Sequence, residues 1–99
     1  MAFDVHVFEA QATASGDGTR KAGQRHAMMI YLRHAADSDH DWQAAEQVAL
    51  DNGWSDVEFG RAGVLSQSSV AERGDPFLSC YNSALEDGEA ILVYSDPIT

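Results

Sequence analysis

The densest cluster of potential metal ligands in the chain is the segment Asp37-Ser-Asp-His-Asp41. Aspartates at positions one, three and five begin the calcium-binding loop of an EF-hand. That loop also requires glycine at position six and glutamate at position twelve, where this chain has Trp42 and Val48. We therefore predict that the cluster caps a helix, because carboxylates accept hydrogen bonds from the free N–H groups of a first turn. A divalent cation held by His40 is the alternative.

The four histidines and the single cysteine show none of the paired spacings typical of a zinc site. His6 and His34 fall on two segments expected to pair as strands, so their rings can approach each other. Cys80 follows the start of an expected helix and lies beside its apolar positions, which predicts a core residue rather than a nucleophile. We therefore expect no bound metal and no cofactor, and we assign no catalytic residue.

The glycine-rich segment from Gly16 to Gly23 resembles a phosphate-binding loop only in composition. It lacks the GxxxxGK[ST] order, and no helix is expected to follow it and offer its N-terminus to a phosphate. We predict a hairpin loop, on which Arg20 and Lys21 are candidates for contact with an acidic partner or a small anion.

The net charge is −10, from sixteen acidic and six basic residues. This charge disfavours nucleic acid, whose affinity for proteins comes largely from Lys and Arg. It favours solubility or attraction to a basic protein. One cysteine permits no internal disulfide, and the sequence shows neither a signal peptide nor an apolar run that could span a membrane. We expect a cytoplasmic protein.

Alternation of apolar and polar residues predicts strands over 3–12 and 26–34, joined as a hairpin. A helix is predicted over 39–51, ended by Gly53. A strand from Val57 to Leu65 should follow, and Gly60 and Gly63 indicate a bend or bulge in it. After a polar connector over 66–74, Asp75-Pro76 begins a second helix that ends at Gly88. Residues 90–94 form the last strand.

These elements predict one α+β domain over residues 1–99, in the order β-β-α-β-α-β. We expect a two-layer sandwich, with a mixed or antiparallel four-stranded sheet and both helices on one of its faces. This architecture is similar to the ferredoxin-like folds, although the opening hairpin departs from their usual order.

If the helices cover one sheet face, the other face is open and is the expected binding site. Phe3, Val5 and Val7 are expected beneath the helices together with Met28, Ile30 and Leu32. The residues expected to face outward are His6, Phe8, Met29, Tyr31, Arg33 and Tyr94. An exposed face with aromatic residues and methionine favours association with another protein, most simply as a homodimer.

The sequence thus predicts a small acidic binding or interaction module, acting without catalysis through this sheet face. One alternative is a small enzyme that uses histidine, tyrosine and arginine side chains of the same face. The other is an inhibitor or immunity-like protein for a basic partner, motivated by the net charge.

Overall fold

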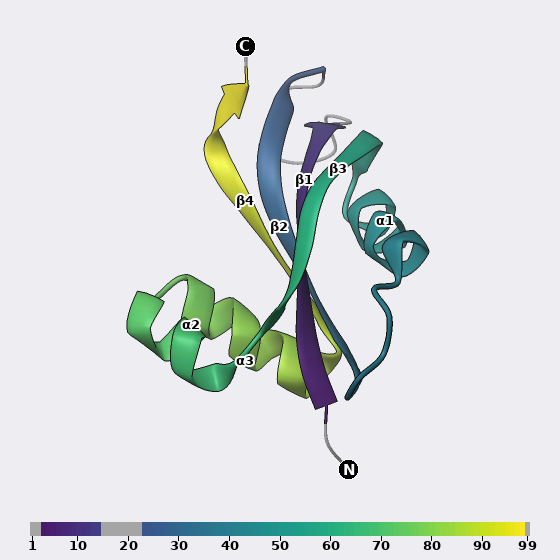
Figure 1. Ribbon diagram of the computed structural model, residues 1–99. Coiled ribbons are helices and arrows are strands. Elements are labelled where there is room, and N and C mark those ends of the chain that lie inside the picture. The colour runs from purple at the N-terminus through teal and green to yellow at the C-terminus, as the bar shows by residue number, and fades with distance from the viewer. Residues whose placement is uncertain (1–2, 15–22, 99) are drawn as a thin grey trace.

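The computed structural model describes residues 3–14 and 23–98 of the chain. Its elements are β1 (Phe3–Ala14), β2 (Arg25–Ala35), α1 (Trp42–Asp51), β3 (Trp54–Leu65), α2 (Gln67–Arg73), α3 (Phe77–Asp87) and β4 (Glu89–Ile98). The strands form one sheet in the order β3-β1-β2-β4, and every neighbouring pair is antiparallel (Figure 1). The α+β class and an antiparallel four-stranded sheet are therefore confirmed. Arg20 and Lys21 lie outside the described residues.

Both predicted helices are present, although α1 begins at Trp42, three residues later than predicted. Asp41 caps α1, because its carboxylate accepts a hydrogen bond from the Ala44 N–H at 3.0 Å. This geometry confirms the capping interpretation of the acidic cluster. Gly88 ends α3 with a φ of 95°, in the left-handed region that glycine enters without strain.

The polar connector expected over 66–74 is wrong, because α2 occupies most of it. Ser66 caps this helix by accepting a hydrogen bond from the Ser69 N–H at 3.3 Å. Only one apolar side chain of the helix, that of Val70, is buried among those described. A single apolar anchor gives no helical periodicity, so the sequence pattern did not indicate a helix.

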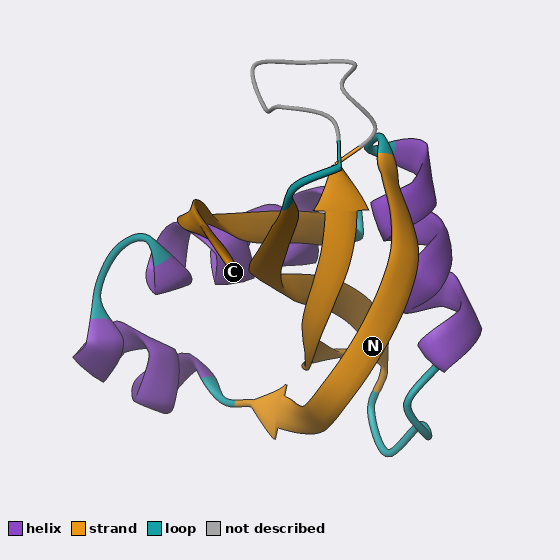
Figure 2. Cartoon of the chain, turned by 90° about the horizontal axis from the view of Figure 1, so that it is seen from above, coloured by secondary structure: helices purple, strands orange, loops and turns teal. Residues whose placement is uncertain are grey.

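The expectation that the helices share one sheet face is also wrong. In the β1–β2 pair, Phe8 lies opposite Ile30 and Val7 opposite Tyr31, so even-numbered residues of both strands share one face. The helix α1 packs on this even-numbered face, whereas α2 and α3 pack on the odd-numbered face (Figures 1 and 2). The expected grouping of Val5 and Val7 with Met28 and Ile30 is therefore wrong by one residue of register. Such a shift moves every side chain of a strand to the opposite face, and the long hairpin loop does not fix the register. The likeness to ferredoxin-like folds is not confirmed.

Each face has its own apolar core. Under α1 the core joins Phe8, three alanines of β1, and Met28, Ile30 and Leu32 of β2 to the buried face of the helix. Under α2 and α3 it joins Val5, Val7 and Tyr31 to the buried Val70, Tyr81 and Ala84.

The strand β3 carries two irregularities in its pairing with β1. Gly60 and Arg61 together stand opposite Glu9, because the register changes between the Phe8–Ala62 and Ala10–Phe59 pairs. A second change falls between the Gln11–Glu58 and Thr13–Ser55 pairs. The bulge predicted for this strand is therefore confirmed at Gly60, while Gly63 pairs regularly with Val7.

Candidate functional site

A groove of about 340 Å³ crosses the odd-numbered face of the sheet, and residues of the four strands line it. We call it the strand groove. Its main lining residues are Glu9, Gln11, Ala27, Met29, Glu58 and Tyr94. On the same face, α2 and α3 pack against Val5, Val7, Tyr31 and Leu92, farther along the strands. The helices thus cover one part of this face, and the strand groove lies on another part.

The floor of the strand groove is apolar, and two tyrosine hydroxyls lie against the Met29 sulfur. The hydroxyl of Tyr94 lies 3.3 Å from the sulfur of Met29, and that of Tyr31 lies 4.0 Å from the same atom. Tyr94 is 43% exposed, whereas Tyr31 is fully buried. Burial, with smaller contributions from Cys80 and Tyr94, raises the pKa of Tyr31 to about 12, so its hydroxyl stays neutral. Methionine sulfur beside an aromatic edge makes an adaptable apolar contact surface.

Two carboxylates stand at the rim of the strand groove. Glu9 lies 3.7 Å from the guanidinium of Arg61, whose side chain is 91% exposed. Glu58, 77% exposed, lies 3.4 Å from Arg25. Arg25 also donates to Thr13 Oγ1 at 2.9 Å and to two backbone carbonyls, so its position does not depend on Glu58. Exposed ion pairs of this length contribute little to stability, so both carboxylates remain able to bind another cation.

A smaller hollow, about 200 Å³, continues the strand groove toward α2. Glu9 and Met29 line both hollows, and Arg61 and Arg73 line the smaller one. The Arg73 guanidinium lies 5.1 Å from the Phe77 ring, a cation–π distance. The two hollows together give a surface that is acidic at one end and basic at the other.

Three histidines meet on the even-numbered face. The Nδ1 atoms of His6 and His40 are 3.0 Å apart, and the ring centroids of His6 and His34 are 4.9 Å apart. The predicted approach of His6 and His34 is thus confirmed. His6 is fully buried. Burial, together with the nearby His40 and His34, lowers the pKa of His6 against the opposing effect of Asp4.

The histidine cluster does not form a metal centre in the described residues. No three His, Cys, Asp or Glu side chains among them are arranged to hold a metal ion. The Nε2 atoms of His6 and His34 are buried and have no hydrogen-bond partner within the same part of the chain. Both rings pack against other imidazole rings, and His6 also shares its Nδ1 hydrogen bond with His40.

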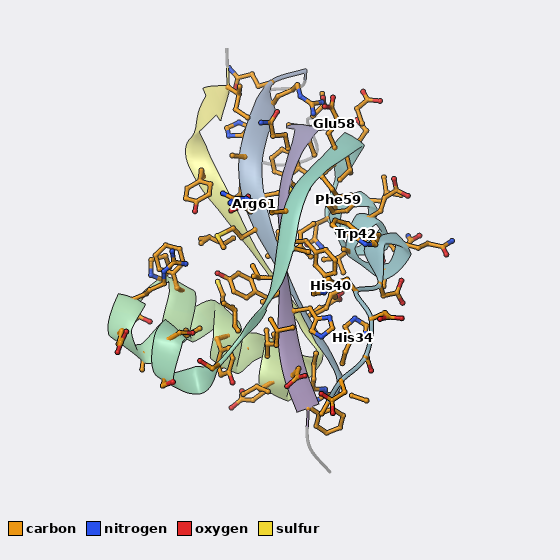
Figure 3. The ribbon with its side chains drawn as sticks, viewed as in Figure 1. His34, His40, Trp42, Glu58, Phe59 and Arg61 are labelled. Atoms are coloured by element: carbon orange, nitrogen blue, oxygen red, sulfur yellow. The ribbon has the colours of Figure 1, made fainter. Side chains whose placement is uncertain are left out.

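Aromatic rings continue from the histidines to α1. Phe8 packs edge-on against Trp42 at 5.2 Å and against His40 at 5.6 Å, and Trp42 packs against Phe59 at 5.3 Å. Figure 3 shows His34, His40, Trp42 and Phe59 on the α1 side of the sheet, with Arg61 on the opposite side. These contacts cover the sheet beneath α1 with rings.

The structure divides the residues predicted to share one open face. Met29 and Tyr94 line the strand groove. Tyr31 lies on the same face but is buried beneath α3. His6 and Phe8 are buried on the opposite face, so the expectation that they face outward is wrong. Strand register places them on the face opposite Met29 and Tyr31, and α1 with the segment before it covers that face.

Arg33 is exposed, and its guanidinium donates to the Leu85 carbonyl at 2.7 Å and lies 5.0 Å from the Phe3 ring. It therefore contacts the end of α3 rather than the strand groove. Sequence reasoning missed Glu9, Glu58 and Arg61. The adjacent Gly60, at the bulge, was the signal that could have found them, since bulges often re-aim side chains at sites.

Cys80 is partly buried against the core beneath α3. Burial, and then the nearby Asp75, raises the pKa of its thiol. The thiolate that a nucleophile needs is therefore disfavoured, in agreement with the core position predicted for this residue. Within the described residues, no helix is long and apolar enough to cross a membrane.

Comparison of the chain with protein-family models, with curated proteins and with solved structures gave no match.

Proposed function

We propose that the protein is a binding module that takes a basic segment of a partner protein into the strand groove. The observation that carries the proposal is an apolar floor, Met29 and Tyr94, set beside the exposed carboxylates of Glu9 and Glu58. Such a surface suits a segment that presents one apolar side chain between lysines or arginines.

The charge of the whole chain supports a basic partner. A net charge of −10 attracts a cationic segment and speeds its encounter with the protein. Two copies of the chain would instead bring like charges together. Association with itself through the same surface is the alternative occupant, and the experiment below distinguishes the two.

An enzyme that uses the predicted sheet-face residues has less support. Its candidate groups, among them His6, Tyr31 and Arg33, are divided between two faces, and two of these three are buried. A general base and its substrate must meet within hydrogen-bond reach. The inhibitor or immunity-like role is one form of the proposed binding to a basic partner.

The test uses a fluorescein-labelled hexapeptide of alternating lysine and leucine, with fluorescence anisotropy as the readout. We expect saturable binding that weakens as salt rises, because exposed charges are screened. The double variant Glu9→Gln/Glu58→Gln should bind at least about tenfold more weakly, corresponding to roughly 1.4 kcal/mol. Tyr94→Ala should weaken binding at both low and high salt.

The matched control is Glu46→Gln/Glu72→Gln, which removes the same charge from exposed positions of α1 and α2. Binding by this control should equal that of the wild type. If both double variants lose the same affinity, the peptide is attracted by overall charge and the proposed site is wrong. Sedimentation of the wild type beside Tyr94→Asp tests the other occupant. A wild-type dimer that this substitution dissociates would overturn the proposal of a basic partner.

A further inference from the structure

The contact between His6 and His40 joins the sheet to the segment that precedes α1. His6 is the fourth residue of β1, and His40 lies two residues before the helix begins. Two further contacts tie this segment to β1. The Asp37 N–H donates to the Asp4 carboxylate at 3.2 Å, and the His40 ring packs edge-on against Phe8 at 5.6 Å. The first turn of α1 therefore depends in part on two imidazole rings that remain close together.

The geometry limits how many protons the pair can hold. A hydrogen bond between two Nδ1 atoms requires one N–H and one lone pair, so a neutral pair satisfies it. One added proton is tolerated, since an imidazolium N–H can still donate to the other ring. A second proton would place two N–H groups and two positive charges at a nitrogen separation of 3.0 Å.

The surroundings offer little compensation for a second charge. His34 faces His6 from β2 and would add a third positive charge on protonation. Asp4 is the neighbouring group with the opposite effect, and its carboxylate is already bound by the Asp37 N–H. From β3, Val64 lies opposite His6 and carries no charge. Trp42 of α1 contacts His40 with an uncharged ring.

We propose that the His6–His40 contact is a proton-sensitive latch, which holds the start of α1 on the sheet at neutral pH and releases it in mild acid. Release separates Trp42 from Phe8 and Phe59, because α1 carries the tryptophan and the sheet carries both phenylalanines. The chain then presents an aromatic surface on the face opposite the strand groove. The latch is independent of the proposed binding function.

Amide hydrogen exchange, followed by NMR and corrected for intrinsic rates, measures this opening directly. Between pH 7.0 and pH 5.0, each proton excluded from the closed form and taken up at a reference pKa of about 6.5 raises the opening constant about 25-fold. We therefore expect protection of the Ala44 and Ala45 amides to fall at least that much. Protection of the Ala84 amide, in α3, should remain higher than that of Ala44 and Ala45 at both pH values, because the latch releases α1 alone.

The double variant His6→Phe/His40→Phe keeps two rings in place and removes the titrating nitrogens. Protection at the start of α1 should then not change with pH. His26→Phe, the same change at a buried histidine outside the cluster, should retain the wild-type response. Equal protection of α1 and α3 at pH 5.0, or a pH response that persists in the double variant, would overturn the latch. If the double variant does not fold, protonation of all three histidines in the wild type without loss of α1 protection is the decisive contrary result.

Discussion

The two faces of the sheet differ in how far their helices cover them, and β1 alone shows the difference. From His6 to Ala14, every even-numbered residue of this strand is buried beneath α1 or its approach. The odd-numbered residues begin with Val5 and Val7 beneath the other helices and then change to Glu9, Gln11 and Thr13. Polar residues appear on this face at Glu9, where the strand groove begins. The comparison teaches that one strand can specify a covered face and a partly open one through two independent series of residues.

The largest expected effect is on the covered face. Phe8→Ala should lower the free energy of unfolding by about 3–5 kcal/mol, because it removes a fully buried ring and leaves a cavity among three aromatic neighbours. Met29→Ala, at the half-exposed floor of the strand groove, should lower it by about 1–2 kcal/mol. Urea unfolding measures both. Equal losses would mean that the two faces do not differ in packing.

A smaller effect should come from pH. Because burial lowers the pKa of His6, the native state binds fewer protons than the unfolded state near pH 6. Stability contributed by this residue is fully present above about pH 6.5 and is lost as the pH falls. Between pH 7.5 and 5.5, the loss is at most about 1.4 kcal/mol for one histidine that stays neutral. Urea unfolding of wild type and His6→Phe/His40→Phe at both values measures it, and identical pH dependence would contradict it.

The cap of α1 is the next target. Asp41→Ala should lower the free energy of unfolding by about 1 kcal/mol, because the Ala44 N–H loses its acceptor. Asp41→Asn should recover most of that stability, since asparagine caps equally well. Thermal unfolding of the three proteins at pH 7 compares them. An asparagine variant as unstable as the alanine variant would show that the charge, rather than the hydrogen bond, stabilises the helix start.

The smallest expected effect is at the rim of the strand groove. Arg61→Ala should change the free energy of unfolding by less than about 0.5 kcal/mol, since the Arg61–Glu9 pair is exposed and 3.7 Å long. The same substitution should strengthen binding of the lysine–leucine hexapeptide, because it removes the competing cation from Glu9. A large loss of stability would mean that the groove wall depends on this pair.

Much of the secondary structure could be predicted from the sequence. Alternation located the hairpin, and Gly53, Pro76 and Gly88 marked helix boundaries through local backbone geometry. The helix α2 could not be predicted in this way, since Val70 is its one buried apolar residue among those described. Local patterns identify a helix or strand well only where several residues show the apolar periodicity of that element.

The candidate sites were less predictable, because they depend on register and on contacts distant in sequence. Alternation in β1 correctly placed His6 and Val7 on opposite faces of the sheet. It did not show which residues of β2 share a face with each of them. The proximity of His6 to His34 followed from strand pairing alone. The contact of His40 with His6 required the packing of α1, which no pattern in the sequence specifies. The acidic rim likewise required the bulge to bring Glu58 beside Gln11.

That bulge has a consequence for how the sequence of β3 can vary. With the regular pairing that relates Val64 to His6, Glu58 would stand opposite Ala12 and would enter the core beneath α1. Phe59 would then stand opposite Gln11 and enter the strand groove. One added residue at Gly60–Arg61 exchanges these two destinations without any change of side chain. A single-codon insertion or deletion in β3 is therefore enough to exchange an apolar surface for an acidic one. One point substitution cannot do this, because two side chains must change faces.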